Sequence, residues 1–224
     1  IALLFDLNKM HSELQSSILK LKNTQMRNGA WSWFYGGREN RYITQHIITG
    51  FGHLEKLSVD ITGYSEIVKK AINYLDAQFI KEYYELTKYN AKVELSKDNL
   101  SYTQLHYMYM RSFYPNIKKT KETEEIIKYY HSQIRQYWLN RPLYAKGLMA
   151  LTSYRMGDEI TAKAILKSLK ENSISSEEFG MYWKENENSW YWHQAYIETQ
   201  SLFCNDVPLQ LIGKQLLISY FSFL

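Results

Sequence analysis

The sequence predicts an all-α protein made of stacked antiparallel helical hairpins. Apolar residues recur every three or four positions along most of the chain, which is the spacing of one face of an α-helix. Helices joined by short loops pack as neighbouring pairs, so we expect either a solenoid or a closed α/α ring. No linker rich in Pro or Gly and no change of composition divides the chain, and we therefore expect residues 1–224 to form a single domain.

Nine segments carry a helical pattern. They are residues 8–25, 42–58, 65–87, 101–114, 120–137, 142–156, 161–170, 190–203 and 209–224. Several boundaries have a physical signal. Ser101 is a suitable N-cap, and Pro115 stops the same helix. Pro142 fits a first helical turn, and Gly157 with Asp158 provides a tight turn followed by a cap.

The apolar stripes indicate which face of each helix is buried. The segment 65–87 has the longest stripe, formed by Val68, Ile72, Leu75, Phe79, Tyr83 and Leu86. In segment 42–58 the expected buried face consists of Ile43, Ile47, Gly50, Leu54 and Leu57. A glycine inside a helix costs about 1 kcal/mol relative to alanine. We therefore expect Gly50 to allow another helix to come close.

The loop at residues 28–41 is unusually aromatic for a connection between two helices. Trp31, Trp33, Phe34 and Tyr35 lie within five positions, and glycines stand on both sides of them. Burying one large ring contributes a few kcal/mol. We expect the loop to fold inward, with Trp31 and Trp33 holding the first hairpin in place. The alternative is a pocket lined by these rings that binds a ligand.

A second break in the helical pattern lies between residues 171 and 189. Serines and acidic residues there surround the run Phe179-Gly-Met-Tyr-Trp-Lys184, which predicts a short β-hairpin on the surface near residues 179–184. The apolar run at residues 209–224 is too short to span a bilayer.

Composition and motifs exclude several classes of function. The net charge of +4 is mild and its lysines alternate with acids, so nucleic acid is not an expected partner. Zinc-protease, nucleophile-elbow and phosphate-loop motifs are absent, and we expect no cofactor and no catalytic residue. His46 and His53 lie seven residues apart without a third ligand type nearby, so packing or surface positions are expected instead of a metal site.

An enzymatic alternative comes from carboxylates close to tryptophans near the end of the chain. Glu185, Glu187 and Glu198, together with Trp183, Trp190 and Trp192, have the composition of a glycosidase site on an α/α ring. Glutamates in a polar loop are more often solvated, so the reading as an enzyme ranks below a non-enzymatic one. A helical-repeat scaffold is a third possibility, because Tyr154, Gly157 and Asp158 precede Ala162 and Ala164.

Two blocks carry a resemblance to a known family. The first is Leu21-x-x-x-Gln25-x-x-x-Gly29-Ala-Trp-Ser-Trp-Phe-x-Gly36-Gly37-Arg38-x-x-x-Tyr42-Ile-Thr44-x-x-Ile47. The second is Tyr182-Trp183-x-x-Asn186 followed by Trp190-x-x-x-Ala195-x-x-Glu198-Thr-Gln200. Over about residues 1–206 the chain resembles the thioester-type α/α toroid domain of bacterial alpha-2-macroglobulins, especially the large form of Bacteroidetes.

This resemblance implies a toroid of six hairpins inside a longer exported protein. The nine predicted helices are fewer than the twelve of a complete toroid, so we expect the toroid to be incomplete. The family is thought to trap attacking proteases after cleavage of a bait region. Implied partners are target endopeptidases and neighbouring domains, and the implied location is periplasmic or anchored to the cell surface through an upstream segment. Missing hairpins would leave apolar faces exposed and favour self-association. Structural or interaction roles are expected for Trp31, Trp33, Phe34, Arg38, Tyr42, Trp183, Trp190, Glu198 and Gln200.

The only cysteine, Cys204, has no partner for an internal thioester. Such a bond joins a cysteine to a glutamine three residues later, whereas Val207 stands at that position. The family's Cys-x-x-Gln segment lies upstream of the first block and is not in this sequence. Cys204 continues an apolar helical stripe, where a thiol behaves as a small apolar side chain. We expect no covalent chemistry from this chain.

Overall fold

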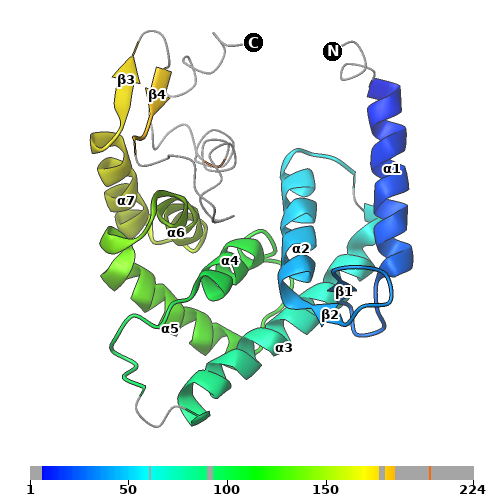
Figure 1. Cartoon of the computed structure of the whole chain (residues 1–224), viewed down its shortest axis with the longest axis horizontal. Coiled ribbons are helices and arrows are strands. Elements are labelled where there is room, and N and C mark those ends of the chain that lie inside the picture. The colour runs from blue at the N-terminus through cyan, green and yellow to red at the C-terminus, as the bar shows by residue number, and fades with distance from the viewer. Residues whose placement is uncertain (1–6, 61, 90–92, 177–179, 185–201, 203–224) are drawn as a thin grey trace. The chain divides into compact units, whose positions relative to one another are not determined.

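The computed structural model describes residues 7–60, 62–89, 93–176, 180–184 and 202 (Figure 1). Within these residues the protein is mostly helical, with seven α-helices and two small antiparallel sheets, and this confirms the predicted all-α class. The predicted helices at 190–203 and 209–224 lie outside the described residues, apart from Leu202.

The internal contacts divide the chain into two compact units. The first contains residues 1–91 and 113–123, and the second contains residues 92–112 and 124–224. Each unit is therefore built from two separate stretches of sequence. The expectation of a single domain stays a prediction.

The first unit contains three long helices. They are α1 (Leu7–Thr24), α2 (Arg41–Lys56) and α3 (Ser65–Tyr89), with a short 3₁₀ turn at Thr62–Tyr64. Asn40 is the N-cap of α2, and its side chain accepts a hydrogen bond from the backbone N–H of Ile43 at 2.9 Å. Helix α3 is the longest described helix. The first four residues of its predicted stripe are buried, namely Val68, Ile72, Leu75 and Phe79.

The buried face of α2 differs from the predicted one. Gly50 is exposed and Leu57 is 75% exposed, whereas the buried residues are Thr44, Gln45, Ile48, Thr49, Phe51 and Gly52. The prediction was wrong because it followed apolar residues alone, while α2 buries the polar side chains of Thr44 and Gln45 on the same side as Ile48. The close approach occurs at Gly52, where an added Cβ would lie 2.6 Å from the ring of Phe113.

These two glycines give opposite expected effects in one helix. Gly50→Ala meets nothing within 4 Å, so it should raise the free energy of unfolding by up to about 1 kcal/mol through helix propensity. Gly52→Ala should lower it by about 1–3 kcal/mol, because the methyl group displaces the Phe113 ring. Urea unfolding of both variants measures the difference. Equal effects of the two substitutions would show that the face of α2 is assigned wrongly.

The segment after the helix at Tyr102–Arg111 explains why that helix is shorter than predicted. Helix α4 (Tyr102–Arg111) begins after the predicted cap, Ser101, but ends three residues before Tyr114. Tyr114 is buried, and its hydroxyl donates to the carbonyl of Ile48 in α2 at 2.7 Å. Burial, followed by the nearby charge of Glu55, raises the pKa of Tyr114 and keeps it protonated as a donor.

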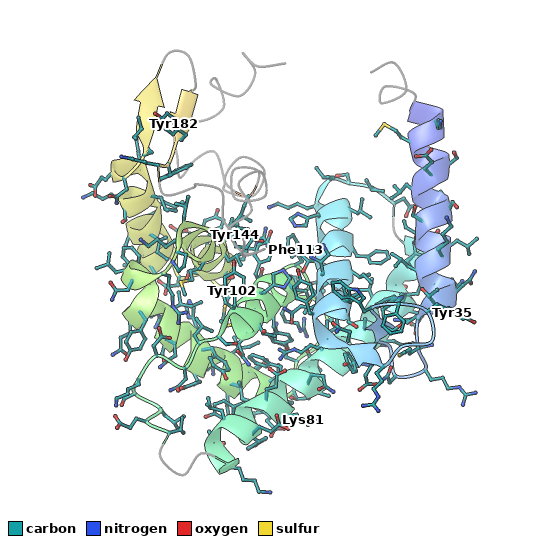
Figure 2. All side chains as sticks on the ribbon, viewed as in Figure 1. Tyr35, Lys81, Tyr102, Phe113, Tyr144 and Tyr182 are labelled. Carbon is teal, nitrogen blue, oxygen red and sulfur yellow. The ribbon has the colours of Figure 1, made fainter. Side chains whose placement is uncertain are left out.

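The second unit is organised around α6 (Leu143–Arg155). Helix α6 packs against α4 and α7 (Glu159–Glu171), and residues on nearly all of its sides are buried. Tyr102 of α4 and Tyr144 of α6 stack with ring centroids 6.0 Å apart (Figure 2). The turn between α6 and α7 contains Gly157 with φ +84°, and the Asp158 side chain caps α7, as predicted. These two helices confirm the predicted helical hairpin.

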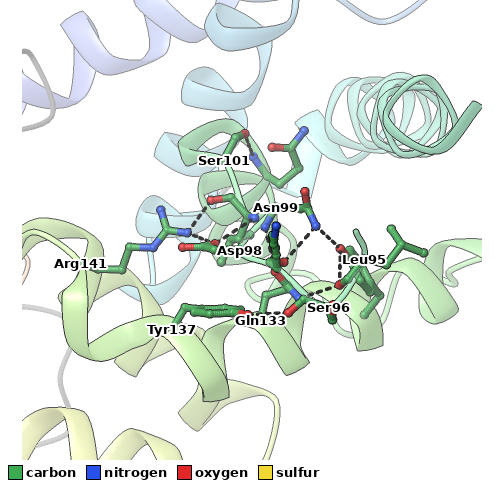
Figure 3. Close-up of polar contacts among 12 residues, drawn as sticks. Leu95, Ser96, Asp98, Asn99, Ser101, Gln133, Tyr137 and Arg141 are labelled. Carbon is green, nitrogen blue, oxygen red and sulfur yellow. Dashed lines mark hydrogen bonds and ion pairs between the residues drawn. The ribbon is translucent and has the colours of Figure 1, made fainter. Parts of the chain in front are cut away.

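Helix α5 (Lys121–Tyr137) clamps the loop that precedes α4. Tyr129, Gln133 and Tyr137 lie one turn apart and donate hydrogen bonds to carbonyls of Leu95 and Ser96 (Figure 3). Gln133 also accepts from the backbone N–H of Asn99 at 2.9 Å. A loop rich in polar residues thereby has its backbone groups satisfied by one face of a helix.

The predicted surface hairpin is present but begins earlier than expected. Strand β3 (Ile174–Ser176) pairs in antiparallel fashion with β4 (Gly180–Tyr182). Trp183 follows β4, is buried, and donates from its indole nitrogen to the carbonyl of Leu169 in α7 at 2.7 Å. The ring of Trp183 therefore attaches the hairpin to α7.

His131 in α5 lies beside the charged pair that closes the α6–α7 turn. Its Nε2 atom is 3.5 Å from Asp158 Oδ2, and Arg135 Nε is 2.6 Å from the same oxygen. Burial lowers the pKa of His131, the charge of Arg135 lowers it further, and Asp158 partly opposes both effects. Burial raises the pKa of Asp158, but hydrogen bonds from Arg135 and Thr161 outweigh it and hold that pKa below its usual value.

These shifts predict that the protein loses stability on acidification. The unfolded chain binds more protons at His131 than the folded one, so stability falls as the pH drops from about 6.5 towards the lower folded pKa. The contribution of Asp158 is complete above about pH 4 and is lost at still lower pH. His131→Gln should flatten the first decline in urea unfolding, while His46→Gln, at an exposed position, should keep it. An unchanged slope in His131→Gln would contradict this assignment.

Candidate interaction site at the aromatic hairpin

The aromatic loop forms a small β-hairpin between α1 and α2. Strand β1 (Trp31–Ser32) pairs with β2 (Glu39–Asn40), so that Trp31 lies opposite Asn40 and Ser32 opposite Glu39. This sheet was not predicted from the residue pattern, which placed strand only near residues 179–184. Residues 33–38 form its tip, and we refer to Trp33, Phe34 and Tyr35 as the aromatic tip.

Trp31 anchors the hairpin to both neighbouring helices. Its ring is 2% exposed, and its indole nitrogen donates to the carbonyl of Leu21 in α1 at 2.8 Å. Its backbone N–H donates to Thr44 Oγ1 in α2 at 2.9 Å, and the Thr44 hydroxyl donates to the carbonyl of Asn40 at 2.8 Å. The inward position predicted for Trp31 is confirmed.

Gln25 and Gly29 connect the hairpin to α3. The Gln25 amide donates to the carbonyl of Gly29 at 3.0 Å and to that of Ile67 at 2.9 Å. Gly29 adopts φ +92°, and a Cβ at this position would lie 2.4 Å from the carbonyl oxygen of Lys70. Only glycine allows this backbone conformation and this close approach to α3 at the same time.

The aromatic tip does not fold inward. Trp33 is 67% exposed, Phe34 is 68% exposed and Tyr35 is 97% exposed (Tyr35 is labelled in Figure 2). The predicted plug is therefore wrong for these three rings. The physical reason is the strand pairing, which holds the chain at Trp31 and Asn40 and leaves the residues between them in a turn outside the core. The ligand-pocket alternative stays a prediction.

Positive charge lies at the base of the aromatic tip. Arg27 and Arg38 are exposed, and each is next in sequence to one member of the contact between Asn28 and Glu39. That contact brings the two arginines to the same end of the hairpin. Glu39 also acts on Tyr74, whose pKa is raised by burial and then by this carboxylate.

The remaining predicted site residues have structural surroundings or lie outside the description. Tyr42 is half-buried and stacks on His46, with ring centroids 6.1 Å apart. His53 contacts the Phe113 ring at 4.9 Å between centroids. The following predicted residues lie outside the described residues: Glu185, Glu187, Trp190, Trp192, Glu198, Gln200 and Cys204.

Metal-binding clusters and membrane-spanning helices are both absent from the part of the chain that the structure describes. No cluster of three or more His, Cys, Asp or Glu side chains there is placed to hold a metal ion. No described helix combines the length and the apolar character needed to cross a membrane.

The polar anchors of the hairpin, Gln25, Asn40 and Thr44, were not predicted from the sequence. Asn40 carries a recognisable signal, since an asparagine directly before a helical pattern is a typical N-cap. The distant contacts of Gln25 and Thr44 have no such local signal, because they reach the carbonyl of Ile67 and the backbone N–H of Trp31. Contacts of this kind depend on tertiary structure and are not visible in residue spacing.

Comparison with protein-family models and with curated proteins finds no match for this chain. Any assignment of function therefore depends on the residues of the chain and on the contacts described above.

Proposed function

We propose that this chain is a non-enzymatic, incomplete α/α toroid domain of an exported bacterial protein similar to alpha-2-macroglobulin. In this role it contacts neighbouring domains of the same protein and takes part in trapping attacking endopeptidases in host or envelope defence. The parent protein is periplasmic or anchored at the cell surface through an upstream segment. The isolated chain is expected to self-associate through faces that further hairpins would cover.

The observation that carries this proposal is that residues of the first resembling block bond to one another. The Trp31 indole N–H donates to the carbonyl of Leu21, and the Trp31 backbone N–H donates to Thr44 Oγ1. The Gln25 side chain donates to the carbonyl of Gly29. These positions hold a loop between helices instead of converging on a reacting atom. Hydrogen bonds of this kind support a structural role for the block, in a domain that contacts other polypeptides.

The experiment uses the full-length protein that carries this chain. After incubation with trypsin, we expect the protease to co-elute with it on size exclusion, to cleave a small chromogenic peptide, and to lose activity on casein. A trapped protease can still reach a small peptide but not a large protein. Retained activity on the chromogenic peptide with lost activity on casein therefore identifies trapping. Trypsin blocked beforehand at its active-site serine is the control, and it should elute free because it cannot cleave the bait. Equal activity of trapped and free trypsin on casein would contradict the proposal.

A second candidate function is an aromatic-lined α/α domain that binds or processes glycans. The observation in its favour is the exposure of three adjacent rings at the aromatic tip. Titration of the chain with polysaccharides, monitored by isothermal titration calorimetry, tests it. A saturable change in wild type that disappears in Trp33→Ala, but persists in Leu57→Ser, would favour the glycan function over the trap.

A further inference from the structure

We propose that the aromatic tip docks on the interface of an anionic lipid bilayer. The inference goes beyond the protease-trapping role and does not depend on it. It follows from the exposure of the tip, the charge beside it and the rigidity of its base.

The three rings of the aromatic tip are exposed to solvent. Trp33, Phe34 and Tyr35 are consecutive and are each at least two-thirds exposed, at a point where the chain turns between β1 and β2. Large rings with a polar edge are enriched where a membrane meets water, because their apolar bodies and polar groups are both satisfied there. Phe34 would contribute the purely apolar part of such a contact.

Size favours a bilayer over a protein as the occupant. Three rings expose at most several hundred Å², whereas a stable protein interface covers about 800 Å² on each partner. A bilayer needs no matching rigid surface, because lipids rearrange around an inserted side chain. A short hairpin tip with three rings is therefore better suited to a lipid surface.

Charge specifies the kind of bilayer. Arg27 and Arg38 are exposed beside the tip, and the neighbouring acid, Glu39, accepts a hydrogen bond from Asn28. Basic side chains next to an apolar insertion are attracted to anionic headgroups, and this attraction weakens with salt. The expected partner is a membrane rich in acidic phospholipids such as phosphatidylglycerol.

The fixed base of the hairpin lowers the entropy cost of inserting the tip into a membrane. Trp31, Thr44 and Gln25 fix the two strands to α1, α2 and α3 before any membrane is met. Little ordering of the backbone is then required on binding, so most of the ring burial contributes to affinity.

The test is co-sedimentation of the whole 224-residue chain with vesicles. One set contains phosphatidylcholine alone and the other phosphatidylcholine mixed with phosphatidylglycerol. We expect binding to the mixed vesicles that weakens with salt, and quenching of tryptophan fluorescence by brominated lipid. The double variant Trp33→Ser with Phe34→Ser, and separately Arg38→Glu, should each reduce partitioning by about tenfold or more.

Two control variants distinguish binding through the aromatic tip from non-specific binding to vesicles. Leu57→Ser removes an exposed apolar side chain elsewhere in the same unit, and Lys128→Glu reverses an exposed charge on α5. Both should bind mixed vesicles nearly as well as wild type, with unchanged thermal unfolding for all variants. Absence of binding, or equal binding by tip and control variants, would overturn the proposal. So would tip variants that abolish self-association in ultracentrifugation without changing vesicle binding, because a second copy would then occupy the tip.

Discussion

Trp31→Ala should lower the free energy of unfolding by about 3–5 kcal/mol, the usual cost of truncating a fully buried large ring. The substitution removes a ring that is 2% exposed and its hydrogen bond to Leu21. It therefore separates the hairpin from α1. Urea unfolding followed by circular dichroism at a helical wavelength measures the loss.

The matched control for Trp31→Ala is Trp33→Ala, two residues away. Trp33 is 67% exposed, and substitutions at exposed positions usually change stability by less than about 0.5 kcal/mol. The two variants lose the same chemical group, so the difference between them reports the burial of the Trp31 ring together with its hydrogen bond to Leu21. Similar losses in both would mean that the aromatic tip is part of the core.

Gly29→Ala should destabilise the protein by about 2–4 kcal/mol. One part of the cost, about 1–2 kcal/mol, is the left-handed backbone conformation at φ +92°. The other part is overpacking, because the new methyl group would lie 2.4 Å from the Lys70 carbonyl oxygen and would push the loop away from α3.

Gly36→Ala separates these two costs. Gly36 also has a positive φ, +78°, but nothing lies within 4 Å of an added Cβ, so only the conformational cost remains. Its loss of stability should therefore be smaller than that of Gly29→Ala by at least about 1 kcal/mol. Equal losses would show that Gly29 does not approach α3 as closely as described.

The helical class could be predicted because it depends on local periodicity. The stripe Val68, Ile72, Leu75 and Phe79 points inward in α3, since one apolar face is enough to place a long amphipathic helix. The caps at Ser101 and Asp158 were predictable for a similar reason, because each side chain accepts from a backbone N–H only three residues away.

The buried face of α2 and the division of the aromatic hairpin depend on tertiary contacts, which residue spacing does not reveal. Helix α2 buries the polar residues Thr44 and Gln45. A prediction from apolar residues alone therefore assigns the wrong buried face to this helix. Trp31 and Trp33 are the same residue type two positions apart, and only the pairing of Trp31 with Asn40 decides which ring is buried. The hairpin could be recognised as important from its composition, but the division into anchor and exposed tip could not.

The central claim is that Trp31 is the buried anchor of the hairpin and Trp33 is presented to a partner. Hydrogen exchange of the tryptophan indole N–H groups, followed by nuclear magnetic resonance and assigned with the two alanine variants, tests it most directly. The Trp31 indole donates to the carbonyl of Leu21 and should exchange slowly, whereas the exposed Trp33 indole should exchange at close to the rate of free tryptophan. Slow exchange of both indoles, or fast exchange of Trp31, would contradict the account.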